Sequence, residues 1–303
     1  MLTADGVAVE AEHLPGTAGI SRTGGPGESG GSAESGEAGG PGESGESGEA
    51  GGPGGSGADG LAIVIAHGFS GALARPAVRR AARDLSRYGG VVTFSFRGHG
   101  RSGGRSTVGD LEVLDLDAAV RWARSLGYAR VAALGFSMGG SVVLRHAGAA
   151  NAAARAQHPG AGGLLPVDAV VAVSSPARWY YRGTAPMRRL HWAVTRPSGR
   201  LVTRLGLRTR IHPRDWDPVP ASPVESVPAV PPTPLLIVHG DRDAYFPLDH
   251  PLSLAEAAGP GGAELWIEPG FGHAENAADA ALLARIGDWL AARVCHDGRR
   301  HDA

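Results

Sequence analysis

The stretch that decides the fold reads VAALGFSMGGSVVLR and covers residues 131–145. An apolar run leads into Gly135, Ser137 and Gly139, and a helix-like segment follows. Strand, G-x-S-x-G and helix in this order place a serine on a tight, strained turn with its hydroxyl group exposed. The two glycines suit this turn because a Cβ at either position would clash where the strand and the helix cross. Ser137 is therefore a candidate nucleophile.

A serine hydroxyl needs a base to accept its proton, and that base is typically a histidine held by a carboxylate. After a turn of this kind the expected chain order is serine, then Asp or Glu, then histidine. The segment LLIVHGDRDAYFP at 235–247 carries Asp241 and Asp243 directly after a strand-like run. The segment ELWIEPGFGH at 264–273 ends in His273 after another such run. The sequence thus supplies both partners of the serine in the expected order.

Four short motifs resemble those of the α/β-hydrolase superfamily, and the resemblance covers about residues 61–294. They are HGF, RGHGRS, GFSMG and HGDRD, which begin at residues 67, 97, 135 and 239. Together they are similar to the motifs of the S33 serine aminopeptidases and the monoacylglycerol-lipase-like hydrolases. The resemblance implies a mostly parallel, doubly wound sheet of the α/β-hydrolase type with a small helical cap insertion.

The resemblance also assigns roles to individual residues. It makes Asp243 the acid that orients His273, and it leaves Asp241 a turn-capping role. An oxyanion hole needs two backbone N–H groups that point at the developing negative charge. One of them belongs to Met138, directly after the nucleophile. Similarity to the HGF loop of the family assigns the other to Phe69.

The remaining histidines are expected to support the scaffold. We expect His67 to tie its own loop together, His99 to hold the RGHGRS loop, and His239 to form a hydrogen bond behind the acid loop. No two histidines have the spacing of metal ligands on a recognisable helix, so the sequence predicts no metal ion and no other cofactor.

Composition limits the remaining possibilities. The chain has 303 residues, enough for one large α/β domain with an appendage, and its net charge of −1 gives no indication of nucleic-acid binding. Cys295 is the single cysteine, which fits a reducing cytoplasm. The N-terminus lacks the features of a signal peptide, and no apolar run reaches the roughly 18 residues of a membrane span. We therefore expect a cytoplasmic protein without an integral membrane segment, whose oligomeric state the sequence does not determine.

Residues 21–60 differ in composition from the rest of the chain. They consist almost entirely of Gly, Ser, Glu, Ala and Pro, which cannot build a core, so we expect disorder. A Gly-X-Y period runs from Gly24 to Gly60, but Ala33 interrupts it and proline is too rare for a collagen helix. The segment is predicted to be an expanded loop in a hairpin between strands at Gly6–Glu12 and Leu61–Ala66.

Strands and helices alternate along the rest of the chain, which predicts a mostly parallel sheet. Expected strands are Leu61–Ala66, Val91–Ser95, Val131–Gly135, Ala169–Val173, Leu235–Val238 and Glu264–Ile267. Expected helices are Pro76–Tyr88, Asp110–Leu126, Ser141–Ala154, Ser253–Ala258 and Ala277–Val294.

The alternation breaks at 176–234, where α/β-hydrolases commonly insert a cap. Two amphipathic segments, Pro186–Thr195 and Ser198–Leu205, precede a proline-rich tail at 218–234 that we expect to be extended. Ten arginines against three acids give this insertion an excess of positive charge. They form either a solvated basic face or a cover that prefers acyl groups with an anionic portion. The chain thus divides into an N-terminal strand region (1–20), a disordered insertion (21–60), the first part of the core (61–175), the cap (176–234), the second part of the core (235–295) and a tail (296–303).

These features predict a serine hydrolase that cleaves carboxylic esters, with acyl or thioester substrates as variants, through a covalent acyl-enzyme. The expected partner is a small ester, with an anionic group as one alternative. An S33-type aminopeptidase is the second hypothesis, although an arginine-rich cap suits the ammonium group of its substrates poorly. A non-catalytic binding protein on the same fold is the third.

Overall fold

The computed structural model describes residues 1–17, 60–156 and 163–296. The insertion predicted to be disordered, apart from Gly60, and the tail at 296–303, apart from His296, therefore lie outside the described residues. Within the described residues, no helix combines the length and the apolar character needed to cross a membrane.

One sheet of seven strands forms the centre of the molecule, in the order β1-β3-β2-β4-β5-β6-β7. β1 is antiparallel to β3, and every other neighbouring pair is parallel, which confirms the predicted fold class. Parallel strands buried on both faces need apolar residues at successive positions, and the strand sequences meet this need. The strands are β1 (Ala11–Leu14), β2 (Leu61–Ala66), β3 (Gly90–Phe94), β4 (Arg130–Phe136), β5 (Ala169–Val173), β6 (Leu235–Gly240) and β7 (Glu264–Glu268).

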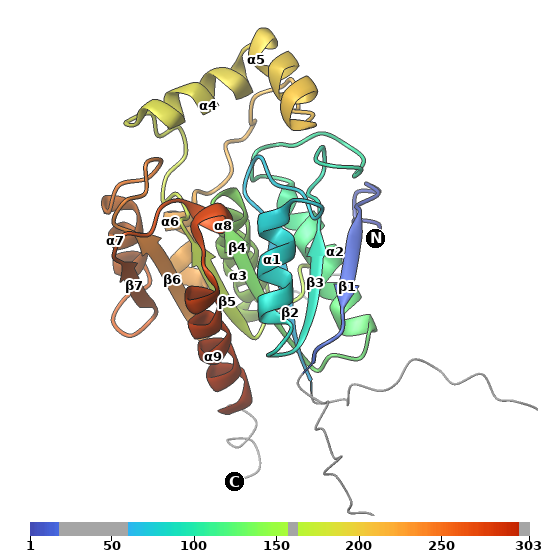
Figure 1. Cartoon of the computed structure of the whole chain (residues 1–303), viewed down its shortest axis with the longest axis vertical. Helices are drawn as coiled ribbons and strands as arrows, with labels where there is room; N and C mark the ends of the chain where they lie inside the picture. The colour runs from blue at the N-terminus through green and yellow to red at the C-terminus, as the bar shows by residue number, and fades with distance from the viewer. Residues whose placement is uncertain (18–59, 157–162, 297–303) are drawn as a thin grey trace, which may run out of the picture.

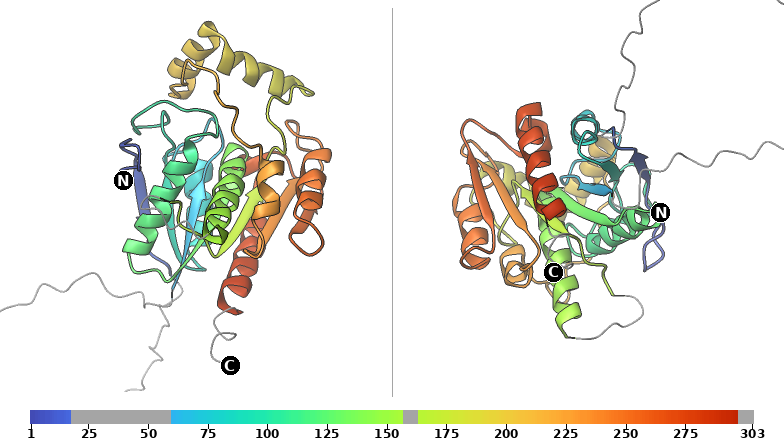
Figure 2. Two further views of the ribbon diagram at one scale, coloured as in Figure 1. Left: turned by 180° about the vertical axis from the view of Figure 1, so that it is seen from behind. Right: turned by 90° about the horizontal axis from the view of Figure 1, so that it is seen from below.

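Helices cover both faces of the sheet, as the ribbon views show (Figures 1 and 2). α1 (Pro76–Leu85) and α9 (Ala280–His296) pack into one apolar cluster with the strands. α2 (Glu112–Ser125), α3 (Met138–Arg155) and α7 (Asp249–Ala257) pack into the cluster on the opposite face. The helix expected at Ala277–Val294 is instead two helices, α8 (Ala274–Ala277) and α9.

The predicted hairpin between the N-terminal strand and β2 is wrong. β1 covers Ala11–Leu14 and pairs with β3, which lies between β1 and β2 in the sheet. The N–H of Thr17 nevertheless donates to the carbonyl oxygen of Ser86 at 2.8 Å, and a Cβ on Gly89 would lie 2.2 Å from the carbonyl oxygen of Leu61. Thr17 and Leu61 therefore both contact the turn between α1 and β3.

The insertion between β5 and β6 rises above the carboxyl ends of the strands (Figure 1). It contains α4 (Ala185–Thr195), α5 (Pro197–Val202) and a π-helical turn, Thr203–Leu207. The tail expected to be extended forms α6 (Pro223–Ser226) and a 3₁₀ turn, Val227–Ala229. Ser222 and Glu225 form a capping box there, which nucleates the helix despite the neighbouring prolines.

Candidate active site

Ser137 stands on the turn between β4 and α3. Its backbone has φ 53° and ψ −113°, a strained conformation for a residue with a side chain. A Cβ on Gly135 would lie 2.2 Å from the carbonyl oxygen of Gly139, and a Cβ on Gly139 would lie 2.1 Å from that of Ala66. The turn closes this tightly only because both flanking residues are glycine.

The structure brings Asp243 and His273 to this serine in one chain of hydrogen bonds. Nδ1 of His273 lies 2.7 Å from Oδ2 of Asp243, and Nε2 lies 3.0 Å from Oγ of Ser137. The Asp243 side chain is fully buried, whereas that of His273 remains 17% exposed. The three residues follow β6, β7 and β4, so the carboxyl ends of parallel strands bring them together.

Asp243 is held as a carboxylate. Burial by itself would raise its pKa, but the bond from His273 and the N–H groups of Tyr245 and Phe246, which donate to Oδ1 at 2.8 and 3.1 Å, lower the pKa below its ordinary value. Asp241 lies apart from His273 and accepts a hydrogen bond from the N–H of Gly270. Asp243 can therefore fix the imidazole with its proton on Nδ1.

The polar groups of the HGF loop are almost all engaged. The carbonyl oxygen of Gly68 accepts from the N–H of Gly71 at 2.8 Å and from Nδ1 of His67 at 2.7 Å. His99 donates from Nε2 to the carbonyl oxygen of Phe69 at 2.6 Å. In a planar trans peptide the N–H points away from the preceding C=O. The Phe69 N–H therefore points away from His67 and Gly71.

Two backbone donors remain beside Ser137. A Cβ on Gly68 would lie 3.4 Å from Cβ of Ser137, which places the HGF loop next to the serine. Met138 is the first residue of α3, so its N–H has no acceptor within that helix. Among the described residues, the Phe69 N–H has no acceptor either. Donors held in this way are already oriented before any negative charge develops on a substrate.

The three scaffold histidines are buried and form hydrogen bonds with backbone groups. Burial lowers the pKa of His67 to about 3, and its Nε2 accepts from the N–H of Phe96. His239 donates from Nε2 to the carbonyl oxygen of Phe246, behind the loop that carries Asp243. Among the described residues, no group of three His, Cys, Asp or Glu side chains could hold a metal ion.

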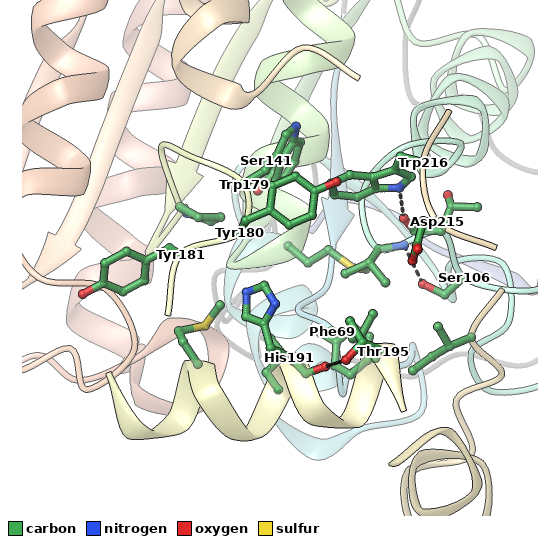
Figure 3. A pocket seen from close by; sticks show the side chains of 18 of the residues that line it. Phe69, Ser106, Ser141, Trp179, Tyr180, Tyr181, His191, Thr195, Asp215 and Trp216 are labelled. Atoms are coloured by element: carbon green, nitrogen blue, oxygen red, sulfur yellow. Dashed lines mark hydrogen bonds between the residues drawn. The ribbon is translucent and has the colours of Figure 1, made fainter. Parts of the chain in front are cut away.

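A pocket opens above Ser137, between the core and the cap (Figure 3). Trp179, Tyr180 and Trp216 line one side, and the inner face of α4, with His191, lines the other. Trp179 and Trp216 donate their indole N–H groups to the carbonyl oxygens of Pro220 and Thr107, so their rings present apolar surface. The lining side chains of α4 include Met187, Leu190 and Val194.

Three arginines also line this pocket. Arg178 forms an ion pair with Asp249, and Nε of Arg200 donates to the carbonyl oxygen of Val194 at 2.6 Å. Arg214 is exposed at the rim. Asp215, which is exposed beside Arg214, also lines the pocket. The pocket is thus mainly apolar, with charged side chains of both signs at its margin.

Two residues beside the site were not predicted from the sequence. Tyr245 stacks on His273 with ring centroids 4.1 Å apart. Glu275 is buried, and its Oε1 accepts a hydrogen bond from the N–H of Gly68 at 3.1 Å. The second contact joins residues 207 positions apart, a separation at which no local pattern can reveal a contact.

Comparison with known proteins places this site in a recognised fold. A crystal structure of a Pyrococcus furiosus esterase has 19% sequence identity and a TM-score of 0.61, over 96% of this chain and 87% of that one. The Penicillium sp. sh18 alpha/beta hydrolase GrgF has 17% identity and a TM-score of 0.58, over 97% of each chain. A search of curated proteins found no match.

At these identities the two structures show similarity of fold alone. The profile described as "Alpha/beta hydrolase family" matches residues 63–286, which span both flanks of the cap and all three residues of the hydrogen-bonded chain. The match extends over most of the sequence, so this protein belongs to the alpha/beta hydrolase family.

Proposed function

We propose that this protein is a serine hydrolase that cleaves carboxylic esters through an acyl-enzyme. The observation that carries the proposal is the continuous chain from Ser137 Oγ through the His273 ring to Asp243, with contacts of 3.0 and 2.7 Å. Membership of a hydrolase family supports the reaction class, and the apolar pocket above the serine supports an ester with an apolar group.

Each residue of the proposed site has a defined role in the reaction. Ser137 Oγ attacks the carbonyl carbon while Nε2 of His273 takes the hydroxyl proton. Asp243 keeps the other ring proton on Nδ1 and stabilises the imidazolium that forms. The N–H groups of Met138 and Phe69 donate to the oxyanion. His273 then gives its proton to the departing alkoxide, and a water molecule, deprotonated by His273, releases the acid from Ser137.

The buried group of the substrate is proposed to be apolar, because aromatic and aliphatic side chains dominate the pocket lining. An anionic substituent would have to meet the arginines at the margin, such as Arg214. Two esters of equal acyl length, one neutral and one with a terminal carboxylate, separate these alternatives. A faster anionic ester at low salt, with its advantage lost at high salt, would support recognition by the arginines.

The proposal is tested with Ser137→Ala and p-nitrophenyl esters from acetate to palmitate. Removing a triad nucleophile lowers kcat by about 10⁶-fold in a comparable mechanism. We expect loss of hydrolysis and of labelling by a fluorophosphonate, with an unchanged circular dichroism spectrum. Ser125→Ala, on an exposed turn of α2, is the matched control and should retain both. Wild-type rates in folded Ser137→Ala would refute the proposal, and failure of the wild type to react would favour a non-catalytic binding protein.

A further inference from the structure

Glu275 lies at the active site without a role in the reaction described above. It follows His273 by two residues, and only 6% of it is exposed. Its Oε1 accepts the Gly68 N–H at 3.1 Å, and both carboxylate oxygens would lie 3.2 Å from a Cβ on Gly68. The carboxylate therefore packs against one face of Gly68, directly beside Ser137.

The helix that carries Glu275 is anchored on two sides. Nη2 of Arg80, on α1, donates to the carbonyl oxygens of Glu275 and Ala278 at 2.8 and 3.0 Å. The N–H of Ala274 donates to Oγ of Ser174 at 3.0 Å. α8 is thus attached to α1 and to the segment after β5, and the Glu275 carboxylate is held against the HGF loop.

This contact completes the set of bonds that fixes the two peptides on either side of Gly68. Gly68 has no side chain to restrict its backbone, so the peptide that follows it could rotate. The Gly68 N–H is held by Glu275, and the Gly68 carbonyl oxygen is held by Gly71 and His67. Rotation of the Phe69 N–H away from Ser137 would break the two bonds to the Gly68 carbonyl oxygen, which belongs to the same peptide. The Glu275 bond holds the preceding peptide, and so keeps the Gly68 backbone in the orientation from which its carbonyl oxygen meets both donors. Glu275 is the one member of the set that comes from the far end of the chain.

We propose that Glu275 is a positioning residue that keeps the Phe69 N–H directed at the oxyanion, an inference that rests on the proposed function. Glu275 acts through Gly68 and does not touch the reacting atoms. Its hydrogen bond to Gly68 uses only an acceptor oxygen, which the neutral acid and an amide also possess. Burial raises the pKa of Glu275 above its ordinary value.

The test compares Glu275→Ala with Glu275→Gln. Loss of one oxyanion donor lowers kcat by about 10²–10³-fold. A misdirected donor is a partial loss, so we expect kcat of Glu275→Ala to fall about 10–100-fold while KM stays within about threefold. Glu275→Gln should retain kcat within about threefold. A trifluoromethyl ketone, whose hemiketal oxyanion uses the same donors, should lose affinity for Glu275→Ala in parallel with kcat.

Asp168→Ala is the control for removing a structural acid. Asp168 accepts hydrogen bonds from Arg124 and from the N–H of Val131, at the opposite end of the strands. The Asp168→Ala variant should have a lower melting temperature than the wild type, with unchanged kcat and inhibitor affinity. If Glu275→Ala does not fold, the test uses Glu275→Leu instead. Leucine has a volume similar to that of glutamate but no hydrogen-bond acceptor.

The outcomes separate this inference from the proposed function. An active wild type together with unchanged kcat in Glu275→Ala overturns the positioning role and leaves the function intact. Equal losses in the alanine and glutamine variants also overturn it, because the glutamine keeps the acceptor. A wild type without hydrolysis overturns both proposals.

Discussion

At the residue scale, the two aspartates of the HGDRD motif have different environments. The Asp243 side chain is buried and contacts His273, whereas Asp241 is exposed and accepts a hydrogen bond from the N–H of Gly270. Asp243→Asn should lower kcat about 10⁴-fold, because an amide favours the wrong imidazole tautomer. Asp241→Asn should lower it less than tenfold, since it removes only a surface hydrogen bond. Kinetics of the two single variants on one p-nitrophenyl ester test this, and the reverse ranking would move the acid to Asp241.

At the element scale, α4 determines the shape of the pocket. Leu190 lines the pocket from the inner face of α4. Leu190→Trp should therefore reduce kcat/KM for long acyl esters at least about tenfold and leave acetate hydrolysis nearly unchanged, because each methylene in an apolar pocket is worth about 1–3 kcal/mol. Leu205→Trp is the matched control, since Leu205 is 74% exposed on the π-helical turn. A uniform loss for all chain lengths would contradict a role of α4 in acyl selection.

At the scale of the whole molecule, buried neutral histidines should make the fold sensitive to acid. Burial lowers the pKa of His67 to about 3 and that of His250 to about 4, and it lowers the pKa of His99 and His239 too. The unfolded chain binds these protons near pH 6.5, so stability is complete above that pH and falls as the pH decreases toward the folded-state pKa. Each histidine contributes a slope of up to about 1.4 kcal/mol per pH unit.

Urea unfolding at pH 7.0, 6.0, 5.0 and 4.5 measures this slope before most carboxylates are protonated. Nδ1 of His250 accepts a hydrogen bond from the N–H of Ala177, and a glutamine side chain can still accept this bond. His250→Gln should therefore reduce the dependence of the free energy of unfolding on pH. A free energy of unfolding that stays constant from pH 7.0 to 4.5 would contradict the assignment of neutral buried histidines.

The sequence by itself determined the fold class and the residues proposed for catalysis. Apolar strands between helices require a buried parallel sheet, and Ser137, Asp243 and His273 each follow the carboxyl end of such a strand. Because those ends share one edge, the local motifs predicted that a serine, an acid and a histidine meet there. The resemblance of HGDRD to the family motif selected Asp243 over Asp241. The close approach of Gly135 and Gly139 is likewise a local property of one turn.

Only the tertiary structure decided the pairings between distant segments. β1 pairs with β3 because strand order depends on contacts across the sheet, which a short N-terminal strand does not encode. The same holds for Glu275 on Gly68 and for the pocket lining, since each joins residues far apart in sequence. The helix at Pro223–Ser226 went unpredicted because its proline content outweighed the Ser222–Glu225 capping pattern. Packing between residues far apart in sequence therefore determined the details of the site, because local sequence patterns do not specify such contacts.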